Sequence, residues 1–449
     1  MTNHEDNVLD AVIVGAGLAG LTAAYRMRDK NILLLEKEDV CGGRTVSRKM
    51  GEYVYNTGAQ VVLSDDSETA KLAREIGVEK TLINKTRMPM HMKGRLITAP
   101  LRPRTLGEPL FLWRLPIPIM EKVKMGLRVL RIRSRYSELV DQEPDPNNAK
   151  TQELCAETLA DFMDAAHPDI RAIWDTLSMG ANTTTADQVA AFQPINTFLH
   201  FAEDEYYVTG GTWELTKTLW NRVKDKTETS AIVDDIVQTD GAVRISYDHA
   251  GQRKSVTARR CIISIPGPLV PGIVKDMPQW KRDVLSQVDF GSMTSAGFLL
   301  SENSERFLGE GVWRVPIVGR KIVSVTNPTF TFPREVKRRT GQGLLRVYTG
   351  DKASKELQRM SDGEALEVLT EELVSAFPAI AGKIVETSIK HWEHAISPWR
   401  IGRLEIAERI KQPTGRIHYC GDYTVSGGLE AAVLSAYRVL REMQQEPAA

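Results

Sequence analysis

The chain has 449 residues, enough for about two or three domains, and its 58 Lys and Arg balance 58 Asp and Glu, so the formal net charge at pH 7 is zero. This balance gives no indication of nucleic acid or of an acidic partner, and a hydrophobic content of 42% supports large cores. The four cysteines lie far apart without a CxxC or a disulfide-like spacing, so we expect a reducing, cytoplasmic location.

The first predicted element is a short buried strand at 11–14, followed by a glycine turn and a helix, which begins a βαβ dinucleotide-binding unit. Gly15 permits the tight turn, Gly17 lets the backbone approach a pyrophosphate, and Gly20 lets the helix pack on the sheet. The phosphates would bind the unpaired N–H groups of the helix. The residues before this strand are polar, so we expect no signal peptide, and no segment approaches the length of a membrane-spanning helix.

A second predicted strand, at 31–35, ends in Glu36, at about the 20-residue spacing of the acid that accepts hydrogen bonds from a ribose diol. Gly42 and Gly43 then precede Arg44, whose guanidinium could lie against the same pyrophosphate. Both features favour a bound dinucleotide.

After a predicted strand at 53–56, the small residues of Gly58-Ala59-Gln60 suggest a close approach of the backbone to a flat ligand. A bulge or an ordinary turn would give the same pattern.

A largely helical insertion is predicted from about 98 to 220, because helix-like spacing occurs near 119–136, 158–166 and 169–179. The run 109–120 is mostly apolar and is followed by basic residues on one face of a helix. It could form a channel mouth or a patch that rests on a membrane surface. We favour a buried loop followed by a solvated basic face, because the run lacks helical amphipathicity.

The second half alternates between the two parts of the protein. Buried strands at 229–236, 260–266 and 416–420 return to the nucleotide-binding domain, and a helix opens at 427–432. Between them, strands at 295–300, 321–325 and 344–348 and a helix at 363–377 predict a sheet with helices on one side. His391 and His394 form an HxxH without an obvious third ligand, so we expect no metal site.

Four of these motifs together resemble the FAD-binding signature of the flavin-containing amine oxidoreductase superfamily, which includes monoamine and polyamine oxidases, protoporphyrinogen oxidase and carotenoid desaturases. The GGR and the small-residue turn belong to the flavin pattern, so the resemblance implies FAD and not NAD. The motifs are Gly15-Ala16-Gly17-Leu18-Ala19-Gly20, Leu35-Glu36-Lys37, Gly42-Gly43-Arg44 and Gly58-Ala59-Gln60.

By the same resemblance, the backbone of Val233 would meet the adenine end of FAD, and Asp422 would accept from a ribityl hydroxyl. The helix that begins near Gly428 would point its N–H groups at the flavin pyrimidine ring, where negative charge develops on reduction. The implied cofactor-binding residues are Gly15, Gly17, Leu18, Ala19, Gly20, Glu36, Lys37, Gly42, Gly43, Arg44, Gly58, Ala59, Gln60, Val233, Gly421, Asp422, Gly428, Leu429 and Glu430.

The expected fold is α/β, an FAD-binding Rossmann-type domain with a discontinuous α+β substrate domain. The FAD-binding domain would comprise residues 1–97, 228–273 and 413–449. The substrate domain would comprise the largely helical residues 98–227 together with residues 274–412.

Two positions depart from typical amine oxidases. Ser295 stands where a lysine contacts a water beside the flavin, and Gly428 stands where an aromatic residue forms half of the amine cage. The companion aromatic could be Trp392 or Trp399, although either is more often core. Gln60 is a further substrate-facing candidate. No cysteine falls where monoamine oxidases attach their flavin, so we expect non-covalent FAD.

An open position above the flavin suits a bulkier or flatter substrate. We therefore predict an FAD-dependent oxidase or dehydrogenase that removes a hydride equivalent from C–C or C–N bonds of a sizeable, partly apolar small molecule, as protoporphyrinogen oxidase and desaturases do. The alternatives are a flavin amine oxidase that produces imine and hydrogen peroxide, and a non-catalytic flavin-binding protein. We assign no catalytic acid or base.

Overall fold

The structure is a computed structural model that describes residues 8–83, 89–98, 110–139, 143–200, 205–239 and 241–445. Its nucleotide-binding layer is a five-stranded parallel sheet with the order β10-β2-β1-β14-β20, which brings strands from both ends of the chain together. The expected α/β fold is confirmed. The strands are β1 (Ala11–Val14), β2 (Ile32–Leu35), β10 (Thr227–Glu228), β14 (Cys261–Ile263) and β20 (Ile417–Tyr419).

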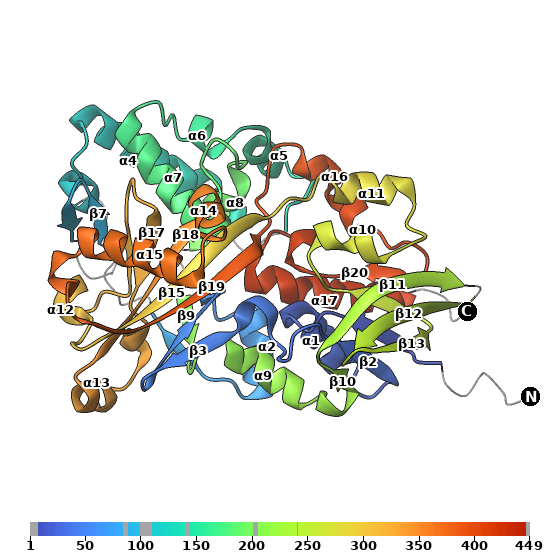
Figure 1. The fold of residues 1–449 in the computed structure, drawn as a ribbon. Coiled ribbons are helices and arrows are strands. Elements are labelled where there is room, and N and C mark those ends of the chain that lie inside the picture. The colour runs from blue at the N-terminus through green and yellow to red at the C-terminus, as the bar shows by residue number, and fades with distance from the viewer. Residues whose placement is uncertain are drawn as a thin grey trace, which may run out of the picture.

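Both faces of this sheet are covered, as is usual for parallel sheets (Figure 1). Val12 and Ile13 point to opposite faces, because side chains alternate along a strand. Ile13 packs among helices, whereas Val12 packs against a three-stranded antiparallel sheet. The helices on the first face are α1 (Leu18–Arg26), α2 (Glu68–Ile76), α9 (Trp213–Asn221) and α17 (Gly428–Gln445), and the strands on the second are β11 (Ala231–Thr239), β12 (Ala242–His249) and β13 (Gln252–Ala258).

A second five-stranded sheet, entirely antiparallel, has the order β16-β17-β18-β15-β19. Its strands include those predicted at 295–300, 321–325 and 344–348. The helix α15 (Asp362–Ala376) packs on it, starts at a capping box made by Ser361 and Glu364, and ends before Pro378. The strands are β15 (Gly291–Leu300), β16 (Arg314–Pro316), β17 (Ile322–Thr326), β18 (Gly343–Gly350) and β19 (Ile384–Ile396).

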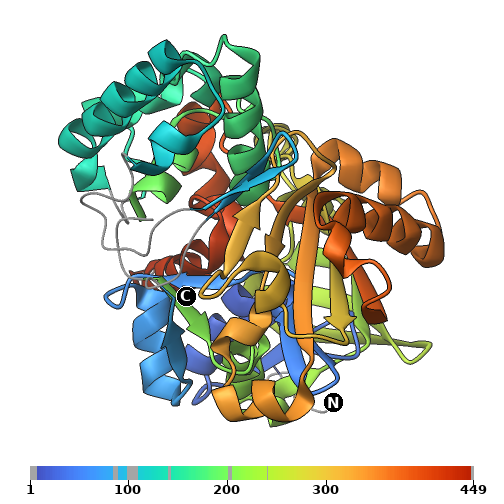
Figure 2. The same cartoon turned by 90° about the vertical axis from the view of Figure 1, so that its left-hand side faces the viewer.

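The predicted helical insertion has its own hydrophobic core and occupies the upper part of Figure 1 and Figure 2. The first and third predicted segments are helices at the predicted positions, and the one expected at 158–166 is reduced to a single short helix, whereas α5 and α8 were not predicted. They are α4 (Ile119–Arg135), α5 (Ala149–Ala156), α6 (Leu159–Phe162), α7 (Pro168–Asn182) and α8 (Phe192–His200).

The apolar run before α4 differs from the expected buried loop. Residue 109 lies outside the described residues, and residues 110–114 are helical. Leu115 and Ile117 are buried, but Leu110 and Trp113 are exposed. The run therefore contributes only part of its apolar surface to the core of the insertion.

The segment 205–227, expected in the insertion, packs with the nucleotide-binding layer. The strand β9 (Glu205–Val208) pairs with β5 (Val61–Leu63) and β6 (Lys80–Leu82), and α9 shares a core with α1. We therefore propose that the domain boundary lies near residue 205, because hydrophobic packing and not chain order defines a domain.

Shorter elements complete the described fold, and none of the helices in the described residues is long and apolar enough to cross a membrane. These elements are β3 (Ser47–Met50), β4 (Tyr53–Asn56), β7 (Met90–Met92), β8 (Arg95–Ile97), α10 (Val270–Ile273), α11 (Gln279–Leu285), α12 (Glu305–Leu308), α13 (Arg334–Thr340), α14 (Asp351–Leu357) and α16 (Arg403–Lys411).

Candidate functional site

The glycine turn between β1 and α1 has the geometry that its spacing predicts. Gly15 has a φ of +99°, and a Cβ on Gly20 would lie 2.0 Å from the Gly15 carbonyl oxygen. At Gly17, by contrast, no described atom lies within 4 Å of the Cβ position, and no described side chain caps the start of α1. The first N–H groups of α1 therefore remain available to an anion.

Glu36 lies at this turn, as its spacing predicts. Its Oε2 accepts a hydrogen bond from the Ala16 N–H at 2.6 Å, and its Oε1 accepts from the Glu38 N–H at 3.0 Å. The side chain is buried, and this burial raises the pKa of Glu36 above its ordinary value. A buried carboxylate beside the glycine turn can accept further hydrogen bonds from a sugar diol.

The GGR segment lies directly against the glycine turn. The Gly42 N–H donates to the Ala16 carbonyl at 2.8 Å, and a Cβ on Gly43 would lie 3.3 Å from the Gly17 Cα. Two motifs that are distant in sequence therefore lie side by side.

Arg44 is paired with Asp422, a contact that the sequence reasoning did not foresee. Its two terminal nitrogens donate to the two carboxylate oxygens at 2.9 and 2.6 Å, and one also donates to the Ala395 carbonyl at 2.7 Å. The predicted contacts of Arg44 with a pyrophosphate and of Asp422 with a ribityl hydroxyl stay predictions. The pair places both side chains in one site.

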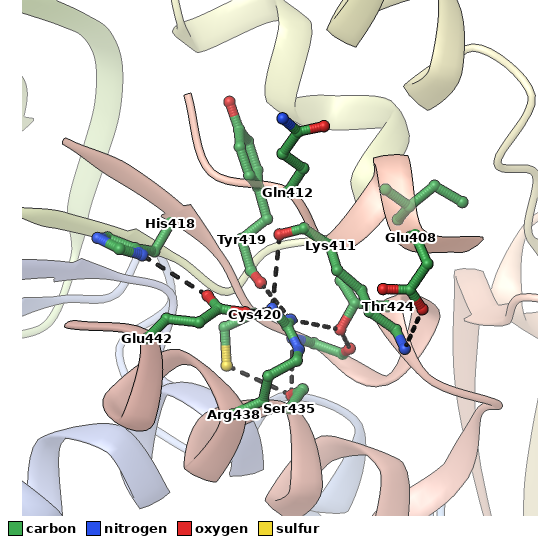
Figure 3. Close-up of polar contacts among 12 residues, drawn as sticks. Glu408, Lys411, Gln412, His418, Tyr419, Cys420, Thr424, Ser435, Arg438 and Glu442 are labelled. Carbon is green, nitrogen blue, oxygen red and sulfur yellow. Dashed lines mark hydrogen bonds and ion pairs between the residues drawn. The ribbon is translucent and has the colours of Figure 1, made fainter. Parts of the chain in front are cut away.

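The turn that carries Asp422 is held by α17, and Figure 3 shows Ser435 and Arg438 of this helix beside Tyr419, Cys420 and Thr424. The Gly421 N–H donates to Ser435 Oγ at 2.9 Å, and Arg438 donates to the Tyr419 carbonyl at 2.8 Å and to Glu442 at 2.7 Å. The Ser435 hydroxyl thus fixes the Gly-Asp turn. The sequence alone gave no signal for this bond.

The side chain of Glu430 is committed to another helix. Its carboxylate accepts from the N–H groups of Glu68 and Thr69 at 2.8 and 2.9 Å, and from the Thr69 hydroxyl at 2.7 Å. These bonds cap the N-terminus of α2. A cofactor contact of Glu430 would therefore come from its backbone in the first turn of α17.

The remaining predicted cofactor residues lie around the same turn. Val233 is on β11, whose Ala231 N–H donates to the Glu36 carbonyl at 2.8 Å. Lys37 is exposed and forms an ion pair with Glu38 at 3.4 Å. The buried side chains of Leu18, Ala19 and Leu429 belong to the core under the turn, which leaves their backbones to face a ligand.

The segment Gly58-Ala59-Gln60 packs on the GGR segment. The Ala59 N–H donates to the Arg44 carbonyl at 3.0 Å, and a Cβ on Gly58 would lie 2.1 Å from the same oxygen. Trp392 donates from Nε1 to the Thr57 carbonyl at 2.9 Å. This places the Trp392 indole and the half-buried Gln60 beside one turn.

Arg346 is the functional candidate that sequence reasoning missed. It lies on β18 with 1% of its surface exposed, and it donates from Nε to Ser295 Oγ at 2.8 Å and from a terminal nitrogen to the Gly58 carbonyl at 3.2 Å. No ion pair joins it to a carboxylate of the described residues. Burial lowers its pKa to about 10, so it remains charged at neutral pH. The sequence feature that could have indicated this residue is a single arginine within the otherwise apolar run 344–348.

Of the two candidate cage tryptophans, only Trp392 is brought to this turn. Trp399 is buried in the core of the insertion, 6.2 Å from Phe192 between ring centroids, and its backbone N–H donates to Gln193 Oε1. Gly428 has a φ of +90°, and no described atom lies within 4 Å of its Cβ position. The space beside Gly428 is therefore open among the described residues.

The HxxH pair does not converge. On β19, His391 bonds to Thr294 Oγ1 through Nδ1 at 2.9 Å, whereas His394 packs on Phe290 at 5.6 Å between ring centroids. Residues three apart on a strand point to opposite faces, so these two rings cannot bind one ion.

Comparison with known proteins gives one family. Residues 18–443 match the family model described as flavin containing amine oxidoreductase. A probable flavin-containing monoamine oxidase A of Dictyostelium discoideum is 23% identical, over 97% of this chain and 98% of that protein. Coproporphyrinogen III oxidase of Bacillus subtilis (strain 168) is 20% identical, over 95% of this chain and 94% of that protein. A structure of wild-type putrescine oxidase bound to putrescine has a TM-score of 0.79 at 17% identity, over 98% of this chain and 99% of that one.

Proposed function

The chain belongs to the flavin-containing amine oxidoreductase family and is an FAD-dependent oxidoreductase, and we propose that it removes a hydride equivalent from a C–C or C–N bond of a sizeable, partly apolar small molecule. The observation that carries this proposal is the open space beside Gly428, since no described atom lies within 4 Å of its Cβ position, at the residue where the family resemblance expects an aromatic wall.

The described residues fit FAD. The uncapped start of α1 and Arg44 would bind the pyrophosphate, Glu36 would bind the ribose, and Asp422 would bind the ribityl chain. The start of α17 would stabilise negative charge on the reduced flavin. FAD, when bound, supplies the acceptor for the hydride equivalent, and the protein orients and shields the reactants.

The cysteines support non-covalent binding of the cofactor. All four are buried and free. Burial raises the pKa of Cys41 and of Cys261 to about 12, so neither is ionised at neutral pH. Because the thiolate is the nucleophile, such buried thiols are poor candidates for a bond to the flavin.

The substrate side departs from an aromatic cage for two reasons. The positive φ of Gly428 disfavours any side chain there, and its surroundings are open. Ser295 has no exposed surface and accepts its hydrogen bond from Arg346, so it points into the protein and not toward a substrate. An open wall of this kind admits a wide or flat molecule.

Amine oxidation is the second candidate. Trp392 could form one wall for an amine, since an indole ring attracts cations. The relatives named above include both an amine oxidase and a porphyrinogen oxidase, so the comparisons are compatible with either substrate class.

Anaerobic bleaching of the FAD-loaded protein tests the proposal. We expect a reduced tetrapyrrole or a polyene to bleach the flavin faster than simple primary amines or diamines. Faster bleaching by amines, with hydrogen peroxide released in air, would replace the proposal by amine oxidation. Protein that takes up no FAD would contradict the cofactor assignment itself.

Two tryptophan variants localise the substrate. We expect Trp392→Phe to change the substrate concentration for half-maximal bleaching, because the ring loses its bond to the Thr57 carbonyl and its larger face. Trp399→Phe is the matched control, since Trp399 belongs to the core, and it should leave that concentration unchanged. The reverse pattern would place the substrate against the insertion.

A further inference from the structure

A band of large apolar side chains is exposed on the helical insertion. It consists of Leu110 and Trp113, which precede α4, and of five residues of α4, and the exposed fractions of the seven lie between 48% and 67%. The α4 residues are Ile119, Met120, Val123, Leu127 and Leu130. We call these five the α4 stripe.

The α4 stripe is a coherent face of the helix. At about 100° per residue, its five members fall within an arc of about 100°. Ile132 lies on the opposite side and is buried in the core of the insertion. The helix thus has an inner apolar face that packs in the core of the insertion and an outer apolar face that no described residue covers. Figure 2 shows α4 along the outer edge of the insertion.

Basic side chains border the α4 stripe on both edges. At the same rotation, Lys124, Arg131 and Arg135 follow one edge, and Lys122 and Arg133 follow the other. The basic residues of α4 outnumber its single acid, Glu121.

The nearby acids neutralise only part of this charge. Glu153 pairs with Arg131 and Arg135, Asp164 pairs with Arg128 and Lys124, and Glu121 pairs with Lys124. Three carboxylates are thus shared among Lys124, Arg128, Arg131 and Arg135, and Lys122 donates to the Trp113 carbonyl, so the described pairs leave an excess of positive charge around the apolar stripe.

We propose that the α4 stripe and Trp113 dock the protein on the surface of an anionic lipid bilayer, with α4 in the plane of the headgroups. An apolar face between basic edges is the pattern of an interfacial helix. Lys122 donates to the Trp113 carbonyl at 2.6 Å and lies 5.3 Å from the centroid of its ring, so a cation and an indole are held together at one end of the stripe. This pairing suits the boundary between headgroups and acyl chains. The proposal does not depend on the substrate.

A second copy of the chain fits this surface less well. A two-fold contact through the α4 stripe would place the basic rim of one molecule near the basic rim of the other. Phosphate headgroups present the complementary charge along both edges.

Co-sedimentation of the FAD-loaded protein with vesicles tests the proposal. We expect binding to vesicles of phosphatidylcholine mixed with phosphatidylglycerol, weaker binding to phosphatidylcholine alone, and release as ionic strength rises. Leu127→Asp combined with Leu130→Asp should lower the partition coefficient about 100-fold, because each apolar side chain contributes about tenfold.

The matched control combines Val385→Asp with Ile401→Asp, two residues of similar exposure that lie outside the band. It should bind vesicles as the wild type does, and both double variants should keep the wild-type FAD content and melting temperature. The proposal is overturned if the wild type does not bind the mixed vesicles or if the Leu127→Asp, Leu130→Asp variant binds equally well. Sedimentation that shows a dimer dispersed by that variant, without vesicle binding, would assign the surface to self-association.

Discussion

Ser295 on β15 is hydrogen-bonded to Arg346 on the neighbouring strand β18, and Arg346 is the buried cation of this pair. Arg346 Nε lies 2.8 Å from Ser295 Oγ, and both side chains are almost fully buried. A lysine at 295 would therefore place a second positive charge, an ammonium group, close to the Arg346 guanidinium, in surroundings that screen charge poorly. We therefore infer that a lysine at 295 and Arg346 would compete for one location.

Restoring the lysine should therefore depend on Arg346. We expect Ser295→Lys to destabilise the protein by about 3–5 kcal/mol, because it buries a like-charge pair. Adding Arg346→Met should recover part of that loss, which thermal unfolding of the two single variants and the double variant would measure. Ser295→Ala is the control and should cost about 1–3 kcal/mol through the lost acceptor. Additive effects of the two substitutions would show that the side chains do not compete.

Glu36 gives a pH-dependent prediction at the same scale. Burial raises its pKa, so in the folded protein it becomes protonated at a higher pH than an exposed glutamate does. A sugar diol donates to the ionised form, and therefore FAD affinity should fall as the pH drops through this raised pKa. Glu36→Gln should weaken FAD binding about 10- to 100-fold near neutral pH and remove this dependence. Titration calorimetry from pH 5 to 8 would measure both effects, and a parallel pH dependence of the variant would contradict the role of the carboxylate.

At the scale of single elements, two glycines of one motif, Gly17 and Gly20, have different surroundings in the turn and helix that they form. Gly20 is packed against the Gly15 carbonyl, whereas Gly17 faces open space at the start of α1. We expect Gly20→Ala to lower the melting temperature of the FAD-free protein, because its Cβ would collide with the backbone. Gly17→Ala should melt as the wild type does without FAD but lose FAD affinity by more than about tenfold, because its Cβ would occupy the approach to the pyrophosphate. Equal stability losses in both variants would mean that the space at Gly17 is not used by the cofactor.

Elements with a strong local pattern could be predicted from the sequence. The alternation of apolar strands and glycine turns located β1, α1, β2 and β20, because a buried parallel strand needs a continuous apolar run. The choice between Trp392 and Trp399 could not be made, because it depends on which strand or core each ring meets. The exposure of Leu127 and Leu130 was missed for the same reason, since an apolar helix face has the same sequence whether it is covered or open.

At the scale of the whole molecule, Arg44 joins three distant segments. Its guanidinium holds Asp422 near the end of the chain and the Ala395 carbonyl on β19 of the second sheet. The motifs around Arg44 and Asp422 were recognised from the sequence. Their pairing was not predicted, because the two residues are 378 positions apart and a local sequence pattern does not indicate contacts at that distance along the chain. The cofactor site and the connection between the two sheets therefore share one ion pair.

Breaking this pair should loosen the molecule and the site together. The side chains of Arg44 and Asp422 are 30% and 5% exposed, so the pair is better shielded than a surface ion pair, and we expect a coupling energy of about 1–3 kcal/mol. A double-mutant cycle of Arg44→Gln and Asp422→Asn, followed by thermal unfolding of FAD-free protein, would measure it. Glu52→Gln is the control, because its ion pair with Arg339 is exposed, and it should change stability by less than about 1 kcal/mol. FAD should stabilise the wild type more than Asp422→Asn, since the variant replaces one charged acceptor oxygen by an NH₂ donor and also loses the ion pair. If the cycle shows no coupling energy between Arg44 and Asp422, the ion pair does not connect the two sheets, and hydrophobic packing alone joins them.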